Sequence, residues 1–80
     1  MSKTTAALQL VEQERDRQNR KWGPQNHEPL MWLAILTEEV GEVAKACAEG
    51  RIEDFDWGNY HEELVQVAAV AVAALECLDA

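Results

Sequence analysis

Three glutamates, Glu38, Glu39 and Glu42, lie close together in an otherwise apolar stretch of the first half of the chain. If this stretch is helical, residues three and four apart are neighbours, and Glu42 repels each of the other two by about 0.2–0.5 kcal/mol. Lys45 is the one basic residue nearby in the sequence. A bound cation is therefore expected to offset the charge of this acidic cluster.

A second group of oxygen ligands follows at Glu62 and Glu63, with Gln66 one helical turn later. Carboxylate and amide oxygens drawn from two helices suit Mg²⁺, a hard cation whose remaining ligands are usually waters and phosphate oxygens. Such an ion would join the acidic protein to the phosphates of a nucleotide, and it would position or activate a water for attack on phosphorus. The two groups together predict a magnesium-dependent nucleotide site.

The helix that carries the first acidic group is expected to have distinct sides. At about 100° per residue, one stripe is apolar and is predicted to be the core face. That stripe comprises Leu33, Leu36, Val40, Val43 and Cys47. The three glutamates share the neighbouring arc, which continues toward the N-terminus as Ile35 and Met31. An arc that is acidic at one end and apolar at the other indicates a pocket wall; the alternative is a solubilising face.

The fold class predicted for the chain is all-α, because no alternating strand pattern competes with three helical segments. The first helix is expected over Thr4–Arg20 and is stopped by Gly23-Pro24. The second is expected over Pro29–Glu49, with Gly50 as its C-terminal cap. The third is expected over Asn59–Leu78, with the Asn59 side chain accepting a backbone hydrogen bond at its start.

The apolar composition of the third helix also predicts that the chain associates with further copies of itself. Its segment Val67–Leu75 is apolar on every side, which is typical of a helix that is buried all round. Three helices can scarcely enclose one of their number, so a second copy of the chain is expected to cover it. The predicted architecture is a dimeric, or tetrameric, helical bundle. Residues 51–58, including Trp57, are expected to form a loop or a single turn before this helix.

The composition of the chain narrows the kinds of molecule that it is expected to bind and the cellular compartment in which it is expected to lie. The 80 residues are expected to form one domain, and their formal net charge of −8 is the wrong sign for holding nucleic acid through its phosphates. No apolar run has the length of a membrane span or of a secretory signal, so a cytoplasmic protein is expected. Cys47 and Cys77 are predicted to be buried thiols in a reducing compartment.

At this point the motifs resemble those of a known family. Glu38-Glu39-Val-Gly-Glu42, followed by Glu63-Leu-Val-Gln66, is similar to the two-part acidic signature of the MazG-like all-α nucleoside triphosphate pyrophosphohydrolases, which include dimeric dUTPases and dCTP pyrophosphatases. The similarity covers nearly the whole chain. It extends to upstream and downstream elements, namely Glu14-Arg15, Gln18, Lys21-Trp22-Gly23, His27-Glu-Pro29 and the segment Gln66-Val-Ala-Ala-Val-Ala-Val of the third helix.

The resemblance implies cleavage between the α- and β-phosphates of a nucleoside triphosphate, with Mg²⁺ as cofactor and Mn²⁺ as a substitute. It implies that Glu39, Glu42 and Glu63 bind the metal and that Glu38 helps to bind it or orients the attacking water. The family's second element usually ends in Asp. Here Gln66 stands at that position, and its amide can supply an oxygen ligand but no charge.

Base and phosphate contacts complete the predicted site. The resemblance places His27 near the base or sugar, and Trp22, Trp32 and Ile35 offer stacking or apolar surface for a base. Core packing is the alternative for the tryptophans. Among the cations able to contact phosphate, Lys45 is favoured over Lys21, Arg17 and Arg51. The competing function is a catalytically weak helical module that senses nucleotide or binds a protein partner.

Overall fold

The computed structural model describes residues 1–49 and 53–78, and these form three α-helices with no strand among them. They are α1 (Lys3–Trp22), α2 (Pro29–Glu49) and α3 (Trp57–Leu78). The prediction of an all-α chain is thus confirmed. The predicted cap Gly50 and the candidate phosphate ligand Arg51 lie outside the described residues. No helix in the described part of the chain is both long and apolar enough to cross a membrane.

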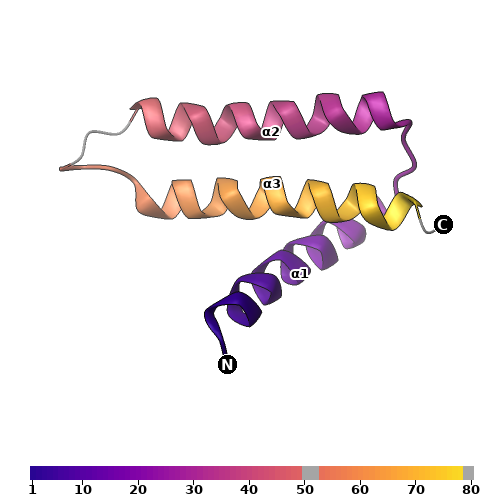
Figure 1. The fold of residues 1–80 in the computed structure, drawn as a ribbon, viewed down its shortest axis with the longest axis horizontal. Coiled ribbons are helices and arrows are strands. Elements are labelled where there is room, and N and C mark those ends of the chain that lie inside the picture. The colour runs from indigo at the N-terminus through magenta and orange to yellow at the C-terminus, as the bar shows by residue number, and fades with distance from the viewer. Residues whose placement is uncertain (50–52, 79–80) are drawn as a thin grey trace.

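The helices are arranged as an antiparallel pair with a third helix across it. Figure 1 shows α2 and α3 running side by side in opposite directions, while α1 crosses α3 at an angle and its N-terminal end diverges from the pair. Among the described residues, α1 packs against α3 and not against α2. α3 is therefore the central element that positions the other two.

α1 is closed at both ends by local hydrogen bonds. The Ser2 hydroxyl accepts a hydrogen bond from the Thr5 backbone N–H at 3.0 Å, which satisfies one of the unpaired amides of the first turn. Gly23 ends the helix at a φ of 73°, and its N–H donates to the Asn19 carbonyl at 2.9 Å. Glycine adopts this left-handed φ without steric cost. The predicted stop at Gly23 is correct, and the helix reaches it by continuing through Trp22.

The start of α3 differs from the prediction. The Asp56 carboxylate accepts a hydrogen bond from the Asn59 backbone N–H at 2.9 Å, so Asp56 is the capping residue and the helix begins at Trp57. The prediction that Asn59 caps the helix is wrong, because an acceptor three residues earlier is available and its negative charge favours a helix N-terminus. Trp57 consequently belongs to the first turn of α3 rather than to a loop.

Substituting the Asp56 side chain tests this cap. Asp56→Ala is expected to lower the free energy of unfolding by about 0.5–2 kcal/mol, the usual cost of losing an N-cap side chain. Asn59→Ala is the matched control, since only the Asn59 backbone takes part in the cap. Urea unfolding followed by circular dichroism at one protein concentration measures both. Equal losses for the two variants would contradict the assignment of Asp56.

The buried core is made of small side chains on the inner side of each helix. Among the described residues, it comprises Val11 of α1, Ala46 of α2, and Ala69, Val70 and Ala73 of α3. The predicted core stripe of α2 is only partly correct, for two of its five residues. Leu36 and Val43 are half-buried, whereas Leu33, Val40 and Cys47 are exposed, because α3 packs against the adjacent arc of α2. The prediction of buried thiols is thus wrong for Cys47, and Cys77 is half-buried.

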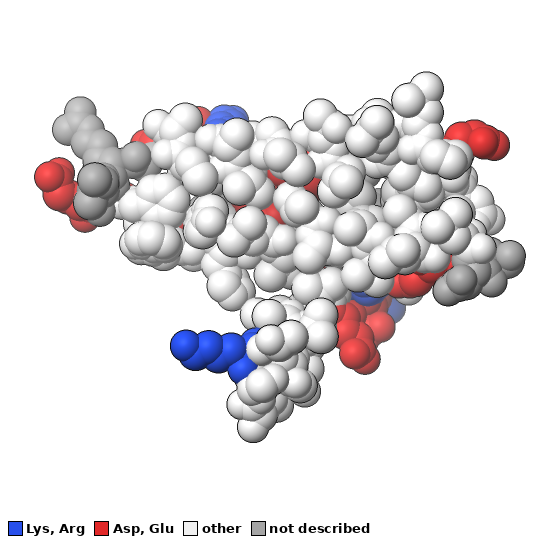
Figure 2. Space-filling view, in the orientation of Figure 1, with Lys and Arg blue, Asp and Glu red and all other residues white. Residues whose placement is uncertain are grey.

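An apolar surface remains uncovered on the side of α2 and α3 that faces away from α1. We call it the open apolar face; it comprises Leu33, Val40 and Cys47 of α2, and Leu64, Ala71, Leu75 and Leu78 of α3. The α2 residues recur every seven positions, as do Leu64, Ala71 and Leu78 of α3, and Leu75 lies one turn from the last two, which places each set along one side of its helix. Figure 2 shows this side of the α2–α3 pair, and charged residues are sparse over its middle.

Candidate functional site

A cavity of about 220 Å³ lies where the end of α1, the start of α2 and the second half of α3 meet. Its aromatic and apolar wall comes from Trp22, Trp32, Ile35, Val70 and Ala73. Its polar wall comes from Arg15, Gln18, Gln25 and Glu39, and Gly23 completes the lining. We call this the interhelical pocket. The pocket therefore places two indoles and several polar groups around one cavity.

Three of the predicted base-contacting residues, Trp22, Trp32 and Ile35, line this pocket together. His27 does not line it, but its ring contacts Trp32 edge-on, with ring centroids 4.8 Å apart and an interplanar angle of 79°. Through this ring contact, His27 supports the part of the pocket wall that Trp32 forms. The buried Nε1–H of Trp32 has no hydrogen-bond partner among the described residues.

Glu39 is the carboxylate that reaches the pocket. It is half-buried on the side of α2 that packs on α3. Burial raises the pKa of Glu39, and the negative charges of Glu63, Glu38, Glu42 and Glu14 raise it further. A carboxylate whose charge is destabilised in this way interacts more favourably with a cation than one in bulk water does.

The other predicted metal ligands are placed differently around Glu39. Glu63 is half-buried on α3, whereas Glu38 and Glu42 are exposed on the outer arc of α2. Within residues 1–49 and 53–78, no three His, Cys, Asp or Glu side chains converge as a group that could hold a metal ion. Mg²⁺, however, is commonly bound by one or two carboxylates together with waters and substrate phosphates. A magnesium ion at Glu39 would therefore have to take most of its ligands from water and phosphate rather than from the protein.

The basic residues gather near the pocket on α1 rather than on the acidic arc. The Lys45 side chain is 65 % exposed and lies 4.0 Å from the Glu49 carboxylate. In contrast, the Lys21 ammonium lies 4.8 Å from the centre of the Trp22 ring, and the Arg17 guanidinium lies 5.8 Å from it. Both cations therefore lie on a ring that lines the pocket, although neither of them is itself a lining residue. Lys45 is not among the pocket-lining residues.

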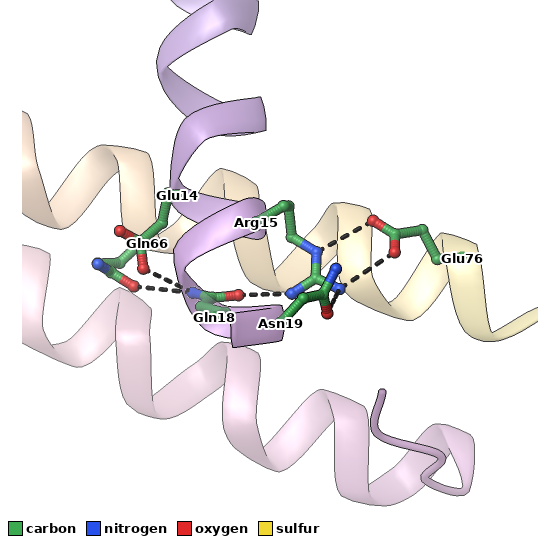
Figure 3. Close-up of polar contacts among 6 residues, drawn as sticks. All are labelled: Glu14, Arg15, Gln18, Asn19, Gln66 and Glu76. Atoms are coloured by element: carbon green, nitrogen blue, oxygen red, sulfur yellow. Dashed lines mark hydrogen bonds and ion pairs between the residues drawn. The ribbon is translucent and has the colours of Figure 1, made fainter. Parts of the chain in front are cut away.

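A chain of polar contacts connects α1 to α3 beside the pocket (Figure 3). The Arg15 guanidinium donates two hydrogen bonds to the Glu76 carboxylate, at 3.0 and 3.1 Å, and another to Gln18 Oε1 at 2.7 Å. Gln18 Nε2 in turn donates to Glu14 at 2.9 Å and to Gln66 Oε1 at 3.2 Å. The predicted metal ligand Gln66 is thus bonded to α1 in this structure.

Hydrogen bonds in this region lower the pKa of two carboxyl groups, Glu14 and Glu76. Hydrogen bonding from Arg17 lowers the pKa of Glu14, with further contributions from Gln66 and Gln18. Hydrogen bonding from Arg15 lowers the pKa of Glu76, although partial burial opposes the shift. Both side chains are therefore held in the ionised form where α1 meets α3.

The Arg15–Glu76 pair predicts a loss of stability in acid. Because the pKa of Glu76 is lower in the folded chain than its ordinary value of 4.5, its contribution is present above that value and is lost as the pH falls through the folded pKa. The stability difference between the wild type and Glu76→Gln is expected to shrink accordingly in acid. The effect should be modest, since the Glu76 side chain is 49 % exposed.

Thermal unfolding of both proteins between pH 7 and pH 3 measures this difference. Glu12→Gln serves as a control, because Glu12 is exposed on α1 and makes no ion pair within the described residues. Its difference from the wild type should stay flat over the same range. A Glu76→Gln curve parallel to the wild type would contradict the assigned role of the pair.

Apart from Glu39, the polar lining of the pocket is not predicted from the sequence. Arg15 and Gln18 belong to the predicted motif without an assigned role, and Gln25 belongs to no predicted motif. One signal was available, since Arg15, Gln18 and Trp22 lie three and four residues apart and so share one side of a helix. Gln25 adds an amide whose Oε1 lies 3.3 Å from His27 Nε2 and whose N–H groups have no partner among the described residues.

The chain matches no known family model, and no curated protein or solved structure is significantly similar to it. The functional assignment consequently depends on the residues and their placement.

Proposed function

We propose that this protein is a Mg²⁺-dependent nucleoside triphosphate pyrophosphohydrolase that releases a nucleoside monophosphate and pyrophosphate. The observation that supports this function best is the interhelical pocket, in which Trp22 and Trp32 share one cavity with the half-buried Glu39. A nucleotide needs both an aromatic surface for its base and a cation site for its phosphates. The resemblance of the acidic motifs to the MazG-like family gives the same class of reaction.

Each part of the site has a distinct role in this proposal. The indoles of Trp22 and Trp32 contact the base, Ile35 supplies apolar surface beneath it, and His27 holds the Trp32 ring by its edge contact. Glu39 and Glu63, with Glu42 nearby on α2, would hold the magnesium ion, for which Mn²⁺ can substitute. Such an ion would supply charge neutralisation for the phosphates and would activate a water. Glu38 would orient the attacking water.

The α1 cations are better placed than Lys45 to contact the phosphates. Lys21 lies against a pocket-lining ring, whereas Lys45 is paired with Glu49 on an exposed surface. Lys21→Gln is expected to raise KM about tenfold, because a hydrogen bond to a charged group contributes roughly 1.5 kcal/mol. Lys45→Gln is expected to leave KM nearly unchanged. Steady-state kinetics compare the two, and a larger effect at Lys45 would restore it as the phosphate ligand.

The experiment that tests the function is incubation with Mg²⁺ and a panel of nucleoside and deoxynucleoside triphosphates. Pyrophosphate and orthophosphate are measured separately, since only cleavage between the α- and β-phosphates gives pyrophosphate directly. Release of pyrophosphate from one or more substrates, abolished by a chelator, supports the proposal. A folded protein that turns over no member of the panel refutes it.

The second candidate is a nucleotide-sensing or protein-interaction module without turnover. The engagement of Gln66 by α1 favours it, because that amide is occupied by Gln18 rather than left open toward a metal. Nucleotide binding that changes tryptophan fluorescence without any hydrolysis would identify this function. Binding together with pyrophosphate release would exclude it.

Self-association forms part of the proposal. The open apolar face leaves leucines of both α2 and α3 uncovered, and burial of such residues is the main favourable term in association. We propose that two copies, or a pair of pairs, assemble through this face with α3 at its centre. The pocket lies on the opposite side, toward α1, so assembly and substrate access are compatible.

A further inference from the structure

Gln66 and Glu14 both contact the amide group of Gln18 on α1. Gln66 Oε1 accepts a hydrogen bond from Gln18 Nε2 at 3.2 Å, and the same nitrogen donates to the Glu14 carboxylate at 2.9 Å. The neutral Gln66 amide is therefore held close to the Glu14 carboxylate.

An aspartate at this position would be unfavourable. It could still accept from Gln18, but it would place a second negative charge beside Glu14. Gln18 Nε2 already donates to Glu14 at 2.9 Å, so the two carboxylates would also compete for one amide group. The neutral residue at position 66 is thus matched to Glu14 on α1.

The hydrogen bond between Gln18 and Gln66 matters because α1 contributes little apolar burial to its contact with α3. Within the described chain, Val11 is the one buried residue that α1 contributes to the core. The polar chain in Figure 3 runs from Gln66 through Gln18 and Arg15 to Glu76. Its two α3 ends are ten residues apart, or about 15 Å along the helix. Polar contacts therefore hold the second half of α1, which forms the pocket wall.

We propose that Gln66 is a positioning residue that docks α1 onto α3, and that it sets the α1 wall of the interhelical pocket rather than binding the metal. Arg15, Gln18 and Trp22 all belong to that wall. The docking role concerns the folded chain alone. Its consequence for nucleotide binding rests on the proposed function.

Backbone hydrogen exchange on the metal-free, nucleotide-free protein tests the docking role. Gln66→Asp is expected to speed exchange of the α1 amides about tenfold relative to those of the α2–α3 pair, a factor equal to about 1.4 kcal/mol. Adding Glu14→Gln to that variant removes the like-charge contact and should restore most of the protection. Gln13→Asp, which puts the same charge at an exposed α1 position, should leave α1 exchange unchanged.

A second variant guards against a general folding defect. Gln66→Leu removes the hydrogen bond to Gln18 without adding charge, so it should loosen α1 less than Gln66→Asp does, and Glu14→Gln should not rescue it. Unchanged α1 exchange in Gln66→Asp, or failure of Glu14→Gln to rescue it, would overturn the proposal. So would tighter Mn²⁺ binding in Gln66→Asp with α1 intact, which would return position 66 to the metal site.

These measurements need no turnover, so they separate this inference from the proposed function. If the protein hydrolyses no nucleotide but the rescue is observed, the docking role stands and the function fails. If hydrolysis is observed without the rescue, the function stands and Gln66 has another role.

Discussion

Glu39→Gln is expected to abolish Mg²⁺-dependent pyrophosphate release and, at the same time, to raise the melting temperature of the metal-free protein. The two effects have one cause. The Glu39 carboxylate is half-buried beside four other glutamates, which makes its charge unfavourable unless a cation is present. Removing the charge relieves that repulsion, but it also removes a metal ligand. Loss of several kcal/mol of transition-state stabilisation corresponds to a rate more than about 100-fold lower.

The control for this prediction is Glu49→Gln on the same helix. Glu49 is exposed and pairs with Lys45, so its substitution should change neither the rate nor the melting temperature by much. Mg²⁺ or Mn²⁺ should raise the melting temperature of the wild type and of Glu49→Gln but not that of Glu39→Gln. Full activity in Glu39→Gln would remove Glu39 from the metal site. A lower melting temperature would show that its charge is compensated within the protein.

The acidic motif illustrates what the sequence predicts and what it leaves to the fold. The helical period correctly orders Glu38, Glu39 and Glu42 around α2, because 100° per residue is fixed by backbone geometry. It does not fix the absolute rotation of the helix against its neighbour. α3 packs against the arc that contains Glu39, so Glu39 is half-buried while the other two are exposed. The same rotation exposes Leu33 and Val40, which the sequence assigned to the core.

The interhelical pocket shows a second limit of prediction from the sequence. Trp22, Trp32 and Ile35 could be proposed from residue type and spacing, and the structure gathers them around one cavity. The polar wall depends on how α1 crosses α3, and that angle comes from contacts such as Arg15 with Glu76, 61 residues apart in the chain. Local patterns carry no information about such pairs. Helix ends are predictable where one cap is available, as at Gly23, and less so where two candidates compete, as at Asp56 and Asn59.

The uncovered leucines lead to the second prediction of large effect, which concerns assembly. Leu75 on the open apolar face and Leu8 on α1 are both 62 % exposed, so they are matched in residue type and exposure but differ in position. Leu75→Glu is expected to dissociate the assembly into single chains. Burying a leucine contributes roughly 1.5–3 kcal/mol, and each face of a symmetric pair carries its own copy of the substitution. The dissociation constant should therefore rise more than about 100-fold.

Sedimentation equilibrium over a range of protein concentrations measures this change, with Leu8→Glu as the control that keeps the wild-type association. Circular dichroism of Leu75→Glu at high concentration shows whether the single chain remains helical once it is separated. Because the described core consists of a few small side chains, the separated chain should also unfold at a lower temperature than the assembled one. A wild type that sediments as a single chain would refute the assembly outright, and equal dissociation by Leu8→Glu would move the interface to α1.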